Sequence, residues 1–87
     1  MSFKNKTVIV TGASSGVGAA CAKMFASNGA NVVIAARSKG ALDVLAKELG
    51  DKVFAQVCDV SDLEACRLLI ATTVEKFGGV DVLVNNA

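Results

Sequence analysis

The stretch Thr11-Gly12-Ala13-Ser14-Ser15-Gly16-Val17-Gly18 decides the fold of this chain. The apolar run before it, Thr7–Val10, is typical of a short buried strand, and apolar residues recur after it at helical spacing. A strand, a glycine-rich turn and a helix start in this order form a phosphate cradle, because the free N–H groups of the first helical turn and the positive end of the helix dipole face one anion. The glycines permit a tight turn and a close approach of the anion to the backbone. In this context the stretch predicts a dinucleotide site.

Apolar runs alternate with helical segments along the whole chain. The runs are rich in Val and Ile and too short for helices, which is typical of strands buried on both faces. They are Thr7–Val10, Asn31–Ala36, Lys52–Val57 and Val80–Val84. The helices between them are expected at Gly16–Asn28, Lys39–Leu49 and Asp62–Phe77. This order, with right-handed crossovers, predicts the α/β class and a Rossmann-type doubly wound parallel sheet of strand order 3-2-1-4.

The sequence also predicts which helix residues are buried and where the helices begin and end. The apolar stripe of the first helix, which we expect to face the core, consists of Val17, Ala20, Cys21, Met24 and Phe25. That of the third is Leu63, Cys66, Ile70, Thr73, Val74 and Phe77. The expected left-handed residues after the helices are Gly29, Gly50 and Gly78. Ser61 with Glu64 predicts a capping box for the third helix.

In the predicted topology the first two helices cover one face of the sheet and the third covers the other. The fourth strand then ends the sheet at a bare apolar edge, which is a hazard for aggregation. We therefore expect residues 1–87 to be the N-terminal part of a single dinucleotide-binding domain whose remainder is absent.

Composition excludes several kinds of chemistry. The sequence contains no His and no Tyr, so no mechanism based on either side chain can come from these residues. The three cysteines are odd in number and form no C-x-x-C pair, so we expect no disulfide framework and no metal site. Cys21 and Cys66 are expected as small buried hydrophobes, in a reducing, cytoplasmic setting. No apolar run approaches the ~18 residues that span a membrane.

Charge is unevenly distributed along the chain. Residues 1–42 contain no carboxylate and all eight acids follow them, although the net charge is only +1. An acid-free half around the glycine-rich turn favours an anionic ligand, although ordinary solvated surface charge explains the same pattern. The basic residues are few and scattered, and no aromatic residues interleave with them, which argues against a nucleic-acid partner.

Three motifs in register resemble the short-chain dehydrogenase/reductase family, in its non-extended branch. They are Thr11-Gly12-x-x-x-Gly16-x-Gly18 at the first turn, Cys58-Asp59-Val60 after the third strand, and Asn85-Asn86-Ala87 after the fourth. The resemblance covers the whole chain. It implies an oxidoreductase that transfers hydride between a nicotinamide cofactor and a small-molecule carbonyl or alcohol substrate, in a full-length protein that is a homo-oligomer, dimer or tetramer.

The resemblance also implies the residues that contact the cofactor. At the turn they are Gly12, Ser14, Ser15, Gly16, Val17 and Gly18. In this scheme Gly12 makes the turn, the other two glycines and Val17 border the pyrophosphate, and the serines offer hydroxyl groups to ribose or phosphate oxygens.

Further contacts are implied after the third and fourth strands. Asp59 would accept from the adenine amino group beside the N–H of Val60, and Asn86 or Ala87 would lie along the adenosine ribose. For Asp59, a helix-capping or loop role is the alternative. For Asn86 and its neighbour Asn85, the alternative is support of the sheet without ligand contact.

The end of the second strand favours NADP(H) over NAD(H). Ala36 stands where an acidic residue would bind the ribose hydroxyls of NAD and repel a 2′-phosphate. Arg37 is a planar, permanently charged fork suited to phosphate, and Ser38 and Lys39 could add to the same site. Against this, Ser15 occupies a position that is basic in many NADP-preferring relatives. Arg37 as a solvated surface charge is the alternative.

The family's catalytic groups are an Asn, a Ser and a Tyr-x-x-x-Lys pair beyond the fourth strand, so we expect no catalytic residue in this chain. Three interpretations stay open. The chain is the cofactor-binding half of an NADP(H)-dependent oxidoreductase, a stand-alone nucleotide-binding module without catalysis, or an inactive truncation fragment.

Overall fold

A computed structural model describes residues 2–86 of the chain. Within them, four strands alternate with three helices, as the sequence predicts. In chain order the elements are β1 (Thr7–Thr11), α1 (Gly16–Ser27), β2 (Asn31–Ala36), α2 (Lys39–Leu49), β3 (Val53–Val57), α3 (Leu63–Phe77) and β4 (Val82–Asn85). The predicted bounds of β2 and α2 are confirmed, and the others move by one or two residues. β4, for example, begins at Val82 rather than Val80.

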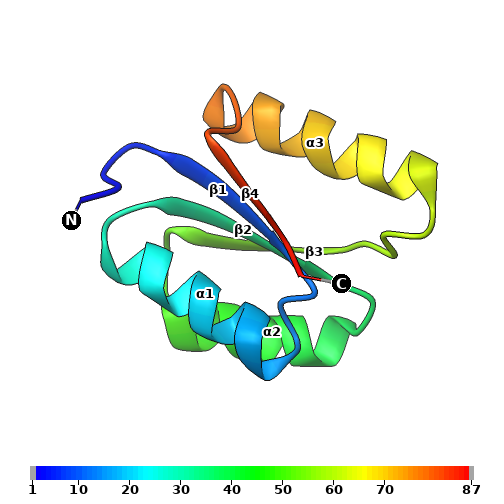
Figure 1. The fold of residues 1–87 in the computed structure, drawn as a ribbon, viewed down its shortest axis with the longest axis horizontal. Helices are drawn as coiled ribbons and strands as arrows, with labels where there is room; N and C mark the ends of the chain where they lie inside the picture. Colours follow the sequence, from blue (N-terminus) through cyan, green and yellow to red (C-terminus); the bar gives the residue numbers. More distant parts are fainter. Residues whose placement is uncertain (1, 87) are drawn as a thin grey trace.

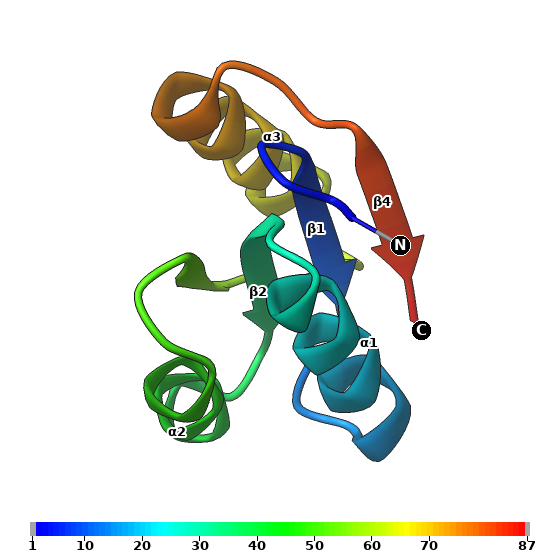
Figure 2. The same cartoon turned by 90° about the vertical axis from the view of Figure 1, so that its left-hand side faces the viewer.

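The strands form one parallel sheet in the order β3-β2-β1-β4, which confirms the predicted topology. β1 lies at the centre, with Thr7 in register with Asn31 of β2 and Val8 in register with Val82 of β4. Helices α1 and α2 cover one face and α3 covers the other (Figure 1). The view in Figure 2 shows α3 on one side of the sheet, α1 and α2 on the other, and β4 at the edge. The doubly wound architecture is therefore confirmed.

The core has two layers because successive strand residues point to opposite faces of the sheet. Val8 and Ile34 face α1 and α2, where Phe25 packs against them. Ile9 and Val33 face α3, where Leu69 packs against them. All four strand residues are fully buried, so the central strands anchor the loops that follow them.

The buried face of α1 agrees with the prediction at Phe25 and in part at Cys21, and differs elsewhere. Its buried residues are Gly18, Ala22 and Phe25, whereas Val17 is 67% exposed and Met24 is 44% exposed. The physical reason is close packing: a Cβ atom on Gly18 would overlap the carbonyl oxygen of Gly12. Small residues therefore face the sheet near the turn, Phe25 packs into the core further along the helix, and Val17 and Met24 are turned outward.

The predicted stripe of α3 is also partly wrong. Leu69 and Thr73 are the buried residues, and Leu63 and Ile70 are 64% and 41% exposed. Leu69 was left out of the predicted stripe, although it lies four residues before Thr73 and therefore on the same face of the helix.

The caps of the helices correct two further predictions. The N-cap of α3 is Asp62, whose carboxylate accepts from the N–H groups of Glu64 and Ala65, so the capping box from Ser61 is wrong. Gly78 ends α3 in the left-handed conformation as predicted. Gly50 after α2 has φ +98° but an extended ψ of −164°, so it is not a left-handed helical cap.

The edge strand β4 is fixed at its start by Asp81. Its carboxylate oxygen Oδ2 accepts a 2.8 Å hydrogen bond from the N–H of Thr7, and its own N–H donates to the Thr7 carbonyl at 2.9 Å. Beyond this point Leu83 is 54% exposed. Within residues 2–86, no helix combines the length and the apolar character needed to cross a membrane.

Candidate functional site

A cavity of about 800 Å³ lies where the carboxyl ends of the four strands meet. Its lining residues are Gly12, Ser14, Ser15, Gly16, Val17, Ala36, Arg37, Ser38, Cys58, Asp59, Val60 and Asn86. The sequence-predicted site residues all line this cavity, except two. Gly18 is buried beneath the wall, and Ala87 lies outside the described residues.

Two lining residues, Ala36 and Cys58, were not predicted as contacts. Ala36 ends β2, and Cys58 comes directly after β3. In a parallel α/β sheet ligands bind outside the carboxyl ends of the strands, and that rule marks both positions.

The turn after β1 depends on the absence of two side chains. Gly12 has φ +61°, in the left-handed region, and a Cβ atom on it would overlap the carbonyl oxygen of Asn86. Gly18 allows the first turn of α1 to contact the Gly12 carbonyl. By contrast, a Cβ atom on Gly16 would meet nothing within 4 Å, so the space beside this residue is open.

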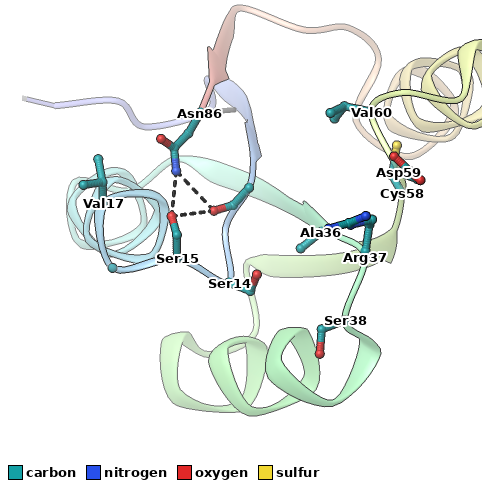
Figure 3. Close-up of a pocket in the computed structure, with 12 residues that line it drawn as sticks. Ser14, Ser15, Val17, Ala36, Arg37, Ser38, Cys58, Asp59, Val60 and Asn86 are labelled. Carbon is teal, nitrogen blue, oxygen red and sulfur yellow. Dashed lines mark hydrogen bonds between the residues drawn. The ribbon is translucent and has the colours of Figure 1, made fainter.

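Ser15 connects the turn, the helix and the fourth strand. Its hydroxyl donates to the Gly12 carbonyl at 2.9 Å and accepts from the N–H of Gly18 at 3.3 Å and from the Asn86 amide nitrogen at 2.7 Å. The same amide nitrogen donates to the Gly12 carbonyl at 3.2 Å (Figure 3). Ser15 is therefore the N-cap of α1 and its hydroxyl is already engaged in the protein. The Ser14 hydroxyl makes no hydrogen bond within residues 2–86.

The N-terminus of α1 is suited to an anion. Among the described residues, none accepts a hydrogen bond from the N–H of Gly16 or of Val17. The first turn contains no acidic residue. Unpaired N–H groups and the positive end of the helix dipole together favour negative charge at this end of the cavity.

The other end of the cavity carries one cation and one carboxylate. Arg37 follows β2 and is exposed, and Ala36 before it presents only a methyl group. The Asp59 carboxylate accepts from the Ser61 N–H at 3.0 Å and from the Ser61 hydroxyl at 2.7 Å. These bonds lower the pKa of Asp59 below its usual value, and the Arg37 guanidinium lowers it further. Asp59 is thus a local turn residue, charged at neutral pH, and lies beside Arg37 (Figure 3).

Ser38 and Lys39 have different roles at the start of α2. The Ser38 hydroxyl accepts from the N–H of Ala41 at 3.4 Å as the N-cap and also lines the cavity. Lys39 does not line it. Its ammonium group lies 2.7 Å from the carboxylate of Asp43, one helical turn onward, so the expectation that Lys39 adds to the site is wrong.

The two asparagines at the end of β4, Asn85 and Asn86, attach this strand to the centre of the sheet. The Thr11 hydroxyl donates to the side-chain oxygen of Asn85 at 3.1 Å and accepts from the N–H of Asn86 at 3.2 Å. Asn85 does not line the cavity. Its position agrees with sheet support, whereas Asn86 both supports the turn and borders the cavity.

Metal chemistry has no support in the described part of the chain. Residues 2–86 hold no group of three or more His, Cys, Asp or Glu side chains placed for a metal ion. All three cysteines are free thiols.

Comparisons with known proteins agree with the fold and the turn. Residues 6–87 match the short chain dehydrogenase family. A fatty acyl-CoA reductase of Mycobacterium tuberculosis is 42% identical over 85 residues, which cover 94% of this chain and 29% of that protein. A 3-ketoacyl-(acyl-carrier-protein) reductase of Brucella melitensis, solved with NADH, superimposes with a TM-score of 0.94 at 42% identity, over 99% of this chain and 36% of that one.

A second solved structure carries the other nicotinamide cofactor. The actinorhodin polyketide ketoreductase with NADPH gives a TM-score of 0.90 at 39% identity, over 94% of this chain and 33% of that one. The sheet and the glycine-rich turn define a Rossmann-type α/β fold. The chain belongs to the short-chain dehydrogenase family, and it spans about a third of the length of these relatives.

Proposed function

We propose that this chain binds NADP(H) in the cavity at the ends of its strands and is the cofactor-binding part of an oxidoreductase that acts on a carbonyl or alcohol substrate. One observation carries the proposal. Unpaired N–H groups at the start of α1 and the Arg37 guanidinium line the same cavity, with no acidic side chain at the end of β2. Two anionic groups of one ligand therefore have a partner each.

The first anionic group is the pyrophosphate. It belongs at the N–H groups of Gly16 and Val17, where the open space beside Gly16 admits it without contact with a side chain. Ser14 contributes a hydroxyl that has no other partner within residues 2–86, whereas the Ser15 hydroxyl acts on the turn itself. We therefore assign ligand contact to Ser14 and a structural role to Ser15.

The second anionic group is the 2′-phosphate of NADP(H). Arg37 offers it a bidentate, permanently charged partner, and the Ser38 hydroxyl retains a proton to donate while it caps α2. Ala36 lacks the carboxylate that would bind an unmodified ribose and repel the 2′-phosphate. Because relatives have been solved with NADPH and with NADH, the choice for this chain rests on its own residues at the end of β2.

The adenine base belongs on the loop after β3. The Asp59 carboxylate oxygen Oδ1 is held by Ser61, which leaves the other oxygen to accept from an exocyclic amino group. Val60 is 47% exposed and supplies an apolar surface beside it.

The family resemblance implies a Tyr-x-x-x-Lys pair as the proton donor for hydride transfer at the nicotinamide, and these 87 residues contain no Tyr. We propose that the full enzyme supplies this group from other residues, and that the 87 residues alone bind the cofactor without turnover. A reducing, cytoplasmic setting agrees with three free cysteines. A homo-oligomeric enzyme is likewise part of the proposal.

A nucleotide-binding module without catalysis is the second candidate, because residues that follow all four strands of this chain line the cavity. Titration of the purified chain with NADPH and, separately, with NADH tests both candidates. We expect saturable binding, tighter for NADPH by roughly tenfold to a hundredfold, the range of a hydrogen bond to a charged group. Equal affinities would overturn the NADP(H) preference, and a folded chain that binds neither would overturn the nucleotide site. A second experiment distinguishes a non-catalytic module from the cofactor-binding part of an enzyme. If the chain is part of an enzyme, adding a segment that contains a Tyr-x-x-x-Lys motif should restore turnover.

A further inference from the structure

Two of the three cysteines lie on either side of the loop that borders the cavity. Cys58 follows β3, lines the cavity and is 3% exposed. Cys66 belongs to the first turns of α3 and is partly buried. Asp59 and Val60, which line the cavity, lie between them.

The fold brings these two thiols into one small cluster. Cys58 packs with Leu69 on the α3 face of the sheet, and Cys66 packs against this cluster. The Cys66 thiol also lies 3.5 Å from the carbonyl oxygen of Val60, to which it donates, so α3 is folded back onto the loop. Burial raises the pKa of the Cys58 thiol, and the neighbouring Cys66 side chain raises it further.

The third cysteine is on the other side of the sheet. Cys21 lies in α1 and packs against the cluster formed by Val8, Ala22 and Phe25. The sheet therefore separates Cys21 from the other two thiols, and only Cys58 and Cys66 are placed to react with each other within one molecule.

We propose that Cys58 and Cys66 form a dithiol pair that a low-molecular-weight disulfide oxidises to an intramolecular disulfide, locking the loop that borders the cavity. Cys66 is partly buried whereas Cys58 is buried, so the thiolate of the more accessible Cys66 attacks the small disulfide, releasing one small thiol and leaving a mixed disulfide. The thiolate of Cys58 then attacks the Cys66 sulfur and releases the second small thiol. Two protein thiols are oxidised and one small disulfide is reduced to two thiols.

The consequence concerns Asp59 and Val60. A covalent link across residues 58–66 holds both lining residues in a closed ring and restricts the loop's conformations. The disulfide can form whether or not the cavity binds a nucleotide. Its test is therefore separate from the test of the proposed function.

Tryptic mapping of the oxidised chain tests the proposal. Residues 53–67 form one tryptic peptide that contains both Cys58 and Cys66, while Cys21 falls in the peptide of residues 7–23. After incubation of the purified chain with oxidised glutathione and alkylation of the remaining thiols, we expect peptide 53–67 to lose the mass of two hydrogen atoms. Peptide 7–23 should be alkylated.

Variants and a denatured sample complete the design. Cys21→Ser should leave the internal link unchanged, and Cys58→Ser should stop the reaction at a glutathione adduct on Cys66. In denaturant, the preference for the internal link over pairings with Cys21 should fall by about tenfold or more, because a fixed neighbour acts at high effective concentration. Persistent adducts on Cys66 in the unaltered chain, or an equal preference in folded and denatured samples, would overturn the proposal.

Discussion

The side-chain amide of Asn86 donates a 2.7 Å hydrogen bond to the hydroxyl of Ser15, which lies 71 residues earlier in the chain. The contact joins the end of the edge strand β4 to the N-cap of α1, across the glycine-rich turn. Ser15 accepts it while it also holds the N–H of Gly18. The shape of the glycine-rich turn therefore depends on a residue that lies at the other end of the sequence.

A double-mutant cycle measures this dependence. Ser15→Ala and Asn86→Ala should each lower the free energy of unfolding by about 1–2 kcal/mol, since each removes a cap or a partly buried hydrogen bond. The coupling between them should be about 0.5–1.5 kcal/mol in chemical denaturation. Ser14→Ala is the matched control, because the Ser14 hydroxyl has no partner within residues 2–86. A coupling of Asn86 to Ser14 as large as to Ser15 would contradict the assignment.

The glycines of the turn should separate folding from binding. Gly18→Ala places a methyl group against the Gly12 carbonyl and should destabilise the fold by about 3 kcal/mol or more. Gly16→Ala meets open space and should change stability by less than about 0.5 kcal/mol. The added methyl group would nevertheless occupy the space assigned to the pyrophosphate, so NADPH affinity should fall. Thermal unfolding and NADPH titration check the two effects, and unchanged NADPH affinity in the Gly16 variant speaks against the phosphate position.

Two neighbouring residues test which face of α3 packs against the sheet. Leu69 is 3% exposed and packs against Ile9 and Val33, whereas Ile70 is 41% exposed. Leu69→Ala should cost about 2–5 kcal/mol, the range for a buried leucine. Ile70→Ala should cost well under half as much. Denaturant unfolding of both variants gives the comparison, and a reversed order would place the wrong face of α3 on the sheet.

The order of the elements could be predicted from the sequence because strands and helices differ in length and in apolar period. Val8, Ile9 and Val33 read as buried strand residues from their neighbours alone, and they are fully buried. The buried face of α1 could be predicted in this way only in part, at Phe25. Where a helix packs closely on a strand it presents Gly18 and Ala22, and an apolar pattern gives such small residues little weight.

Much of the candidate site was expected before the structure, on two grounds. The family resemblance implied Gly12, Asp59 and Asn86, and the end of the second strand indicated Arg37. These residues line one cavity because the loops after parallel strands meet at one edge of the sheet. The sequence did not predict which group each polar side chain contacts. The Lys39 ammonium pairs with Asp43 one helical turn onward, and the Asp62 carboxylate accepts from the N–H groups at the start of α3.

The pKa of Asp59 should depend on the hydroxyl of Ser61. The hydrogen bond from this hydroxyl is the largest cause of the lowered pKa of Asp59, so Ser61→Ala should raise it toward the usual value of 3.8. Ser61→Thr keeps a hydroxyl and should keep the pKa low. Because the pKa is lower in the folded chain, this contact stabilises the fold above the ordinary aspartate pKa. The contribution is lost as the pH falls through the lowered value. Carboxyl NMR titration gives the measurement, and identical pKa values in the Ala and Thr variants would refute the cause.

The measurement that tests the proposed cofactor most directly is the binding of NADPH and of NADH to the Arg37→Ala variant. Arg37 is exposed and lines the cavity, so its removal should leave the fold unchanged. We expect NADPH binding to weaken by about 1.5–3 kcal/mol, the range of a hydrogen bond to a charged group. NADH binding should be nearly unchanged. An equal loss for both cofactors, or no loss for NADPH, would contradict the assignment of Arg37 to the 2′-phosphate.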